Sequence, residues 1–133
     1  MKTFLENYER ANSVGDFSAL SDLYADQFIF ASPNGSQNIK KEDFLKVIPK
    51  RKQFFLSIGL KETKLGTFSF SELDEFYIQI KAQWEMTIQI PKGNAVLIVE
   101  STYIVENRAG VSRIVLQIDH QDLMAKVNAL TES

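Results

Sequence analysis

The clearest pattern in the chain is the alternation of apolar and polar residues between positions 76 and 90. The odd positions are mostly polar, and the even positions are apolar throughout: Phe76, Ile78, Ile80, Ala82, Trp84, Met86, Ile88 and Ile90. A period of two residues indicates a β-strand with one buried face and one solvent-facing side. A strand of this length spans about 50 Å at about 3.3 Å per residue. We therefore expect it to bend strongly around a core.

Other strands are expected before and after this one, at residues 28–31, 65–73, 95–107 and 111–119. Short turn sequences at 91–94 and 108–110 join the last strands of the chain, which predicts that they pair as an antiparallel meander. The strand at 28–31 is short and runs into the turn cluster Pro33-Asn34-Gly35-Ser36.

Apolar residues recur at helical spacing in segments 3–13, 17–24, 41–58 and 122–130. Gly15 is expected to end the first helix and Asp16 to cap the second. Pro49 lacks a backbone N–H, so the third helix should kink or restart there, and Gly59 fits the position just after its end. Helices concentrated in the first third and strands in the rest predict an α+β fold, with the helices on one side of a curved antiparallel sheet.

Composition narrows the class of protein. The chain has 133 residues, of which 44% are hydrophobic and 24% are charged, as expected for one globular domain spanning 1–133. No apolar run approaches the roughly 18–20 residues of a membrane helix, and no secretion signal is evident, so we expect no membrane contact and a cytoplasmic location. The net charge of −2 provides no overall field for binding nucleic acid.

Cysteine is absent and histidine occurs once, at His120. These counts exclude disulfides, thiolate nucleophiles and two-histidine zinc motifs, and we expect neither a metal nor a cofactor. Six of the 15 basic residues cluster on the third predicted helix and just before it: Lys40, Lys41, Lys46, Lys50, Arg51 and Lys52. Two interpretations stay open for this cluster, a solvated helix face or an anion-binding patch.

Four segments taken in order resemble the nuclear transport factor 2-like superfamily, which includes SnoaL-type polyketide cyclases, ketosteroid isomerase and scytalone dehydratase. They are the helix pair around 15–26, the strand and Pro-x-Gly turn at 28–35, the long strand with Trp84, and the last strand from Gly110 to Asp119. The resemblance implies a SnoaL-like domain in which the sheet wraps around the helices as a cone. It further implies a pocket at the wide end and homodimers formed through the outer face of the sheet.

Comparison with ketosteroid isomerase tests particular residues. Tyr8 lies seven residues before Gly15, as the oxyanion-stabilising tyrosine of that enzyme does, so Tyr8 is a candidate hydrogen-bond donor in the pocket. Its alternative role is that of a core tyrosine. The position of the catalytic aspartate is occupied by Ser32, whose hydroxyl cannot act as a base unaided. Steroid-isomerase chemistry is therefore not expected.

Two further residues are candidate acids or bases. Glu100 shares its strand face with Ile98 and Thr102; it is catalytic if that face lines the pocket, and solvated or paired if the face is the outer one. His120 follows Asp119, and an acid–histidine pair is typical of SnoaL-like cyclases. Neighbouring strand residues point to opposite faces, however, so Asp119 and His120 cannot both face inward along a regular strand. Asp122 fits the N-cap of the last helix.

The pocket itself is expected to be apolar. The predicted ligand-binding residues are Trp84, Met86, Phe76, Phe30, Ser32 and Phe55. For Trp84, Met86 and Phe76 the alternative is that their side chains fill the core instead of lining a cavity. The preferred hypothesis is a small soluble domain that binds an apolar small molecule, with His120 or Glu100 as the base and Tyr8 as the donor of a cyclase-, isomerase- or hydratase-type acid–base enzyme. The alternative is a homodimeric binding or partner-interaction module without catalysis.

Overall fold

The computed structural model describes residues 2–14 and 17–131. Within them the elements follow the order α1 (Lys2–Val14), α2 (Phe17–Asp22), β1 (Tyr24–Ser32), β2 (Gly35–Lys40), α3 (Lys41–Ser57), β3 (Leu60–Glu72), β4 (Tyr77–Ile90), β5 (Gly93–Arg108), β6 (Val111–Asp119) and α4 (Leu123–Thr131). The α+β class predicted from the sequence is confirmed. Expectations for Gly15 and Asp16 lie outside the described residues.

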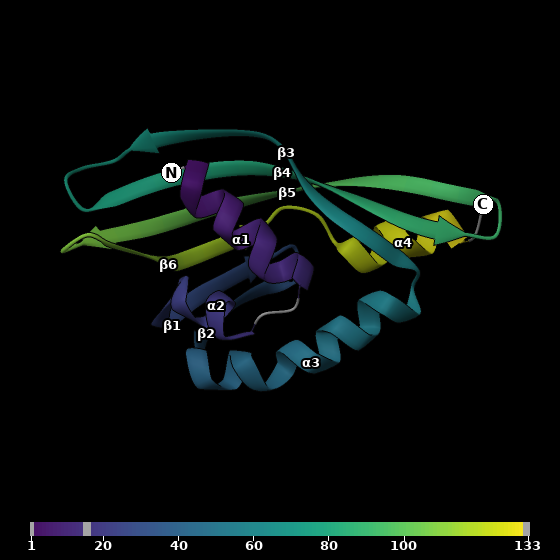
Figure 1. Cartoon of the computed structure of the whole chain (residues 1–133), viewed down its shortest axis with the longest axis horizontal. Helices are drawn as coiled ribbons and strands as arrows, with labels where there is room; N and C mark the ends of the chain where they lie inside the picture. The colour runs from purple at the N-terminus through teal and green to yellow at the C-terminus, as the bar shows by residue number, and fades with distance from the viewer. Residues whose placement is uncertain (1, 15–16, 132–133) are drawn as a thin grey trace.

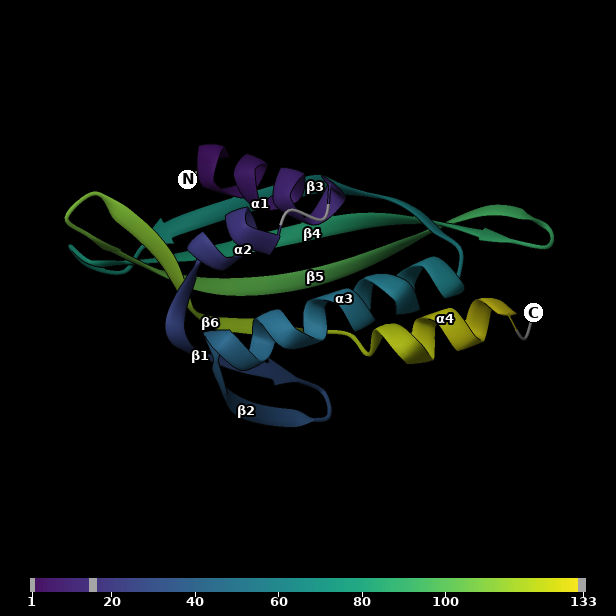
Figure 2. The same ribbon diagram turned by 60° about the horizontal axis from the view of Figure 1, so that its bottom comes forward.

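The described strands form one six-stranded sheet in the order β2-β1-β6-β5-β4-β3. Strands β3 to β6 make the predicted antiparallel meander, and β1 pairs with β6 in parallel. The sheet is strongly curved but not closed, since β2 and β3 remain at its edges. Helices α1, α2 and α3 lie along its inner side (Figures 1 and 2).

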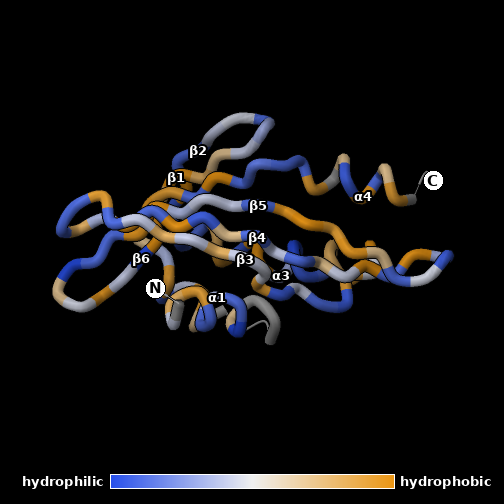
Figure 3. The backbone as a smooth tube through the Cα atoms, turned by 90° about the horizontal axis from the view of Figure 1, so that it is seen from above, coloured by the Kyte–Doolittle hydropathy of each residue, from blue (hydrophilic) through white to orange (hydrophobic). Residues whose placement is uncertain are grey.

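Strand β4 confirms the alternating pattern. Trp84 and Met86 are each 5% exposed, whereas Lys81 and Glu85 between the buried positions face solvent. Strand β4 pairs with β5 along its whole length, from Tyr77 opposite Glu106 to Ile90 opposite Gly93. This long hairpin extends beyond the other strands. In β5, the segment near the turn is mostly hydrophobic (Figure 3).

The core falls into two clusters along this hairpin. The larger cluster joins α1, β1 and the first part of α3 to the middle of the sheet, with Leu5, Phe28 and Ile80 among its members. The smaller cluster lies near the far end of β4 and β5, where Val127 of α4 packs with Ile88. Helix α4 therefore covers the end of the sheet that α1 and α2 do not reach (Figure 2).

Helix α3 ends where the sequence predicts but does not restart at Pro49. It continues from Lys41 to Ser57 with Pro49 inside it and exposed. Gly59 then adopts a φ of +87°, and its carbonyl accepts a 2.8 Å hydrogen bond from the Gln89 amide. A Cβ at this position would lie 2.4 Å from the Gln89 carbonyl oxygen, so glycine is required there.

Two features of the first sheet edge differ from the expectations. Strand β1 begins at Tyr24 rather than at Phe28, and β2 follows it as an additional strand. Nearly every side chain of β2 is exposed, so it lacks the apolar alternation that identifies a strand. No helix in the described part of the chain has the length and apolar character to cross a membrane.

Candidate functional site

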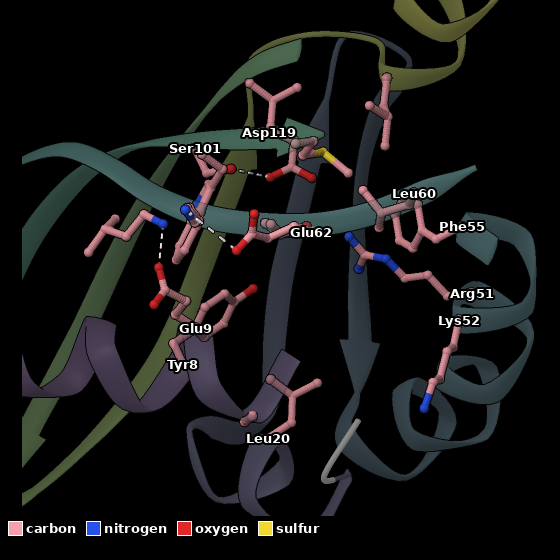
Figure 4. Close-up of a pocket in the computed structure, with 18 of the residues that line it drawn as sticks. Tyr8, Glu9, Leu20, Arg51, Lys52, Phe55, Leu60, Glu62, Ser101 and Asp119 are labelled. Atoms are coloured by element: carbon pink, nitrogen blue, oxygen red, sulfur yellow. Dashed lines mark hydrogen bonds and ion pairs between the residues drawn. The ribbon is translucent and has the colours of Figure 1, made fainter. Parts of the chain in front are cut away.

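A pocket of about 650 Å³ opens between α1, α3 and the inner face of the sheet. Both core clusters contribute to its wall, because β4 and β5 run past the gap between α1 and α4 (Figure 4). Its apolar lining includes Leu20, Ile48, Phe55, Leu60, Trp84 and Met86. The size and lining are typical of sites for small organic molecules.

The carboxylate of Asp119 lies in this wall and is hydrogen-bonded to two neighbouring side chains. Asp119 is the last residue of β6, and its Oδ1 accepts hydrogen bonds from the Ser101 hydroxyl at 2.8 Å and from Gln117 Nε2 at 3.1 Å. Among the described residues no donor contacts the second oxygen, Oδ2. Asp119 therefore keeps one oxygen for a ligand.

A chain of tyrosines fixes the orientation of Gln117. The Tyr24 hydroxyl donates to Gln117 Oε1 at 2.6 Å, which leaves the Gln117 amide NH₂ to face Asp119. The Tyr8 hydroxyl lies 2.9 Å from that of Tyr24. Because the Tyr24 proton is committed to Gln117, Tyr8 must be the donor in this pair. The hydrogen-bond direction thus runs from Tyr8 through Tyr24 and Gln117 to Asp119.

Tyr103 extends this network on the other side of Tyr8. Its hydroxyl accepts a 3.1 Å hydrogen bond from the Trp84 indole N–H, and its ring lies 5.5 Å from that of Tyr8. Burial raises the pKa of Tyr24 and of Tyr103 well above the ordinary tyrosine value, and the neighbouring Tyr8 adds to both shifts. These hydroxyls therefore stay protonated and act as donors throughout the neutral range.

The register of the sheet brings these side chains together. Ser101 lies opposite Asp119 and Tyr103 opposite Gln117, so all four belong to the inner face. An irregularity at Val115 interrupts the alternation of β6, which lets Ile114 and Gln117 both be buried although they are three residues apart. Without it, Gln117 and Ile114 would point to opposite faces.

Five of the residues predicted from the sequence line this pocket: Tyr8, Trp84, Met86, Phe55 and, at its edge, Glu100. Phe30 and Ser32 lie elsewhere, in a depression of about 280 Å³ at the β1–β2 turn. Phe76 is exposed and precedes β4, where the Arg108 guanidinium lies 4.2 Å from its ring centre. The predicted set is therefore distributed over three places.

The two other predicted catalytic residues lie at the rim or outside. Glu100 is exposed at the pocket edge, where its Oε1 accepts a 3.3 Å hydrogen bond from Gln121 Nε2. His120 does not line the pocket; it is exposed, with Nε2 2.6 Å from the Thr102 hydroxyl on the outer face of β5. Asp119 and His120 thus point apart, as the parity argument required. Asp122 caps α4 by accepting from the Ala125 amide at 3.1 Å, which confirms the N-cap prediction.

Sequence reasoning did not single out Tyr24, Ser101, Tyr103 or Gln117 as site residues. Tyr24 continues the helical spacing of the segment before it, although it begins β1. Both faces of β5 carry apolar residues, so alternation does not show that Ser101 and Tyr103 face inward. Among the described residues, no three His, Asp or Glu side chains come together in a group that could hold a metal ion.

Comparison with known proteins identifies the fold. No protein-family model matches the sequence, and no curated protein matches it either. Solved structures do match over nearly the whole chain. An NTF2-like (nuclear transport factor 2-like) protein of unknown function from Shewanella oneidensis is 19% identical with a TM-score of 0.72, over 90% of this chain and 94% of that one.

Two other similar structures give the same fold. An NTF2-like protein with a cystatin-like fold from Novosphingobium aromaticivorans has a TM-score of 0.73 at 14% identity, covering 96% of this chain and 84% of that one. A Xanthomonas campestris protein, provisionally named a polyketide cyclase, has a TM-score of 0.62 at 12% identity, covering 98% and 96%. The NTF2-like, cystatin-like fold expected from the sequence is confirmed.

Proposed function

We propose that the chain binds a small, mainly apolar molecule in the pocket between α1, α3 and the sheet, with a polar group of the ligand at Asp119. The observation that supports this proposal is the carboxylate of Asp119. It lies in a largely apolar wall and accepts hydrogen bonds from Ser101 and Gln117 through one oxygen only. Among the described residues no buried side-chain oxygen lacks a partner, so Oδ2 is open to solvent on the pocket side, where a ligand hydroxyl or amine can replace water as its donor.

The same geometry supports acid–base chemistry at Asp119. A ligand carbon next to a carbonyl would give its proton to Oδ2, and the protonated carboxyl would return it to another atom of the ligand. Tyr8 and Tyr24 act as positioning residues in this proposal, because their hydrogen bonds orient Gln117 and, through it, Asp119. We assign the base to Asp119 rather than to His120, since His120 lies outside the pocket. The provisional cyclase name of the Xanthomonas protein is compatible with this class of reaction.

The binding proposal is tested with 2-naphthol, an apolar bicyclic alcohol, by isothermal titration calorimetry. We expect saturable binding that Asp119→Asn weakens about tenfold, because a hydrogen bond to a charged acceptor is lost. Val99→Phe narrows the pocket and should abolish binding, whereas Val96→Phe on the outer face of the same strand should not. Absence of binding, or equal effects of the two valine substitutions, would contradict the proposal.

The acid–base step is tested with 1-tetralone by measuring the exchange of its α-protons in D₂O. The wild-type chain should accelerate this exchange, and Asp119→Asn should not.

A second function is favoured by the outer face of the sheet. The pairing of Ile104 with Leu116 and of Leu116 with Ile29 places apolar side chains of three strands on this face. Ile98 of β5 is 46% exposed there. Apolar side chains that gather on the outer face of a sheet indicate a surface for association. We propose that two copies of the chain pair through it, a role that is independent of the pocket.

A further inference from the structure

The mouth of the pocket contains cationic side chains that lack anionic partners. Arg51 and Lys52 of α3 and Lys61 and Lys64 of β3 all line it. Among the described residues, Lys64 alone of these four makes an ion pair, 3.6 Å from Glu62. Among the described residues, no carboxylate oxygen lies within 4.0 Å of the Arg51 guanidinium.

Each acidic group of the pocket accepts a hydrogen bond or pairs with a cation, Asp119 through its Oδ1 only. Glu9 accepts a hydrogen bond from the Leu65 amide, and Glu62 pairs with Lys64. Glu100 contacts Gln121, and Asp119 accepts from Ser101 and Gln117. The pocket lining therefore has four cationic and four anionic side chains. Among the described residues, Arg51, Lys52 and Lys61 have no carboxylate oxygen within 4.0 Å, which leaves a place for an anion at the mouth.

Arg51 differs from its neighbours in orientation. Its guanidinium carbon lies 5.3 Å from the centre of the Phe55 ring, one helical turn further along α3. Figure 4 shows the guanidinium reaching toward the interior of the pocket, whereas Lys52 of the same helix extends away from it. Stacking on Phe55 limits the rotamers of Arg51, and a planar guanidinium held in this way suits a bidentate contact with a carboxylate.

We infer that Arg51 selects ligands that carry a carboxylate, and that the substrate class is an apolar ring system with a carboxylate at one end and a hydroxyl or carbonyl at the other. This inference rests on the proposed function, because it assumes that the pocket binds a small molecule. The carboxylate lies against Arg51 on the α3 side, and the opposite polar group reaches Asp119 on the β6 side. Of the six basic residues clustered on and just before α3, this inference assigns anion binding to Arg51 alone.

The test compares 2-naphthol with 6-hydroxy-2-naphthoate, which has the same hydroxyl and adds a carboxylate at the far end of the rings. Calorimetry on the wild-type chain should show the carboxylate compound binding about tenfold more tightly. Arg51→Gln should remove this advantage, so that the variant binds the two compounds with about equal affinity. Lys52→Gln, the matched control on the same helix, should keep most of the advantage. Arg51→Lys should keep only part of it, because an ammonium group cannot make the bidentate contact.

The outcomes separate the two proposals. If 2-naphthol binds but 6-hydroxy-2-naphthoate has no advantage, the selection by Arg51 is overturned and the binding function stands. An advantage that survives Arg51→Gln, or that Lys52→Gln removes equally, likewise overturns it and indicates a general electrostatic effect. If neither compound binds to wild type with the circular dichroism of a folded protein, both proposals fail.

Discussion

At the scale of single residues, two of the buried tyrosines, Tyr24 and Tyr103, make the stability of the fold depend on alkaline pH. They are 1% and 2% exposed, and an ionised phenolate in such surroundings would lose its hydration without a compensating cation. Their raised pKa values mean that the folded state holds both protons at pH values where the unfolded chain releases them. The stability contributed by this difference is fully present below the unfolded pKa of about 10 and is lost as the pH rises above it.

We therefore predict that the ionisation of these tyrosines leaves the free energy of unfolding unchanged near pH 8 and lowers it progressively as the pH rises above about 10. Urea denaturation followed by circular dichroism across this range measures the fall. Tyr103→Phe should make it shallower, because one of the two protons no longer contributes, and should cost about 1 kcal/mol at pH 8 for the lost hydrogen bond with Trp84. A slope that is identical in wild type and Tyr103→Phe would contradict this account.

Single residues also mark the limit of what the sequence could predict about the site. Tyr8 and Trp84 were predictable, because one follows helical spacing and the other strict strand alternation. Gln117 was not, since the irregularity at Val115 changes which side of β6 it occupies. Asp119 and His120 illustrate the same difficulty: parity separates them, but only the register against β5 determines which of the two faces inward.

At the scale of elements, α3 is a case in which the structure differs from a local preference, because Pro49 lies inside a continuous helix. Pro49 leaves the Leu45 carbonyl without its usual partner four residues later, yet the helix passes through. The continuity is explained by packing, because Phe44 and Ile48 before the proline and Phe55 after it all attach to the core clusters. Tertiary contacts thus overcome a local preference for a break.

Replacing Pro49 by alanine should raise the free energy of unfolding by about 2 kcal/mol, the net of a restored hydrogen bond and a more flexible unfolded chain. Pro49 is exposed, so no core contact is lost. Guanidinium chloride denaturation measures the change, and Gln53→Ala at another exposed position of α3 serves as the control, with an expected change within about 0.5 kcal/mol. An unchanged or lower stability of Pro49→Ala would mean that the proline is part of a required bend.

Other elements were predictable to the extent that their pattern is regular. The alternation of β4 predicted its length, its buried face and its bent course, because both faces of that strand are chemically distinct. Strand β2 was not predictable: it is an exposed edge strand that pairs with β1 alone, and its polar residues have no buried face to reveal it. The α+β class was nevertheless predicted correctly, because it depends on the long strands and not on β2 or the start of β1.

At the scale of the whole molecule, the inner and outer faces of the sheet have separate proposed roles. The inner face forms the pocket, and the outer face offers apolar side chains from β1, β5 and β6 for a second copy of the chain. Strands β5 and β6 contribute to both faces through alternate residues, so a substitution on one face is expected to leave the other intact.

This separation predicts that Ile98→Lys disrupts association without affecting the pocket. Size-exclusion chromatography with light scattering should give twice the chain mass of 15.2 kDa for wild type and the single chain mass for the variant. Val47→Lys, at a residue of similar exposure on α3, should leave the dimer unchanged. A wild-type chain that remains monomeric at concentrations of roughly 100 μM, well above the Kd of a standard-size interface, would contradict the dimer proposal.

The position of Trp84 has a practical consequence. It is the chain's one tryptophan, it lies in the pocket wall, and its indole N–H is bonded to Tyr103. Fluorescence excited at the red edge of its absorption therefore originates from a single site on the inner face. A guest molecule that displaces water beside the indole would shift or quench this emission, whereas docking on the far side of the sheet would leave it unchanged. The protein thus contains its own optical reporter, able to distinguish an occupied interior from an occupied exterior.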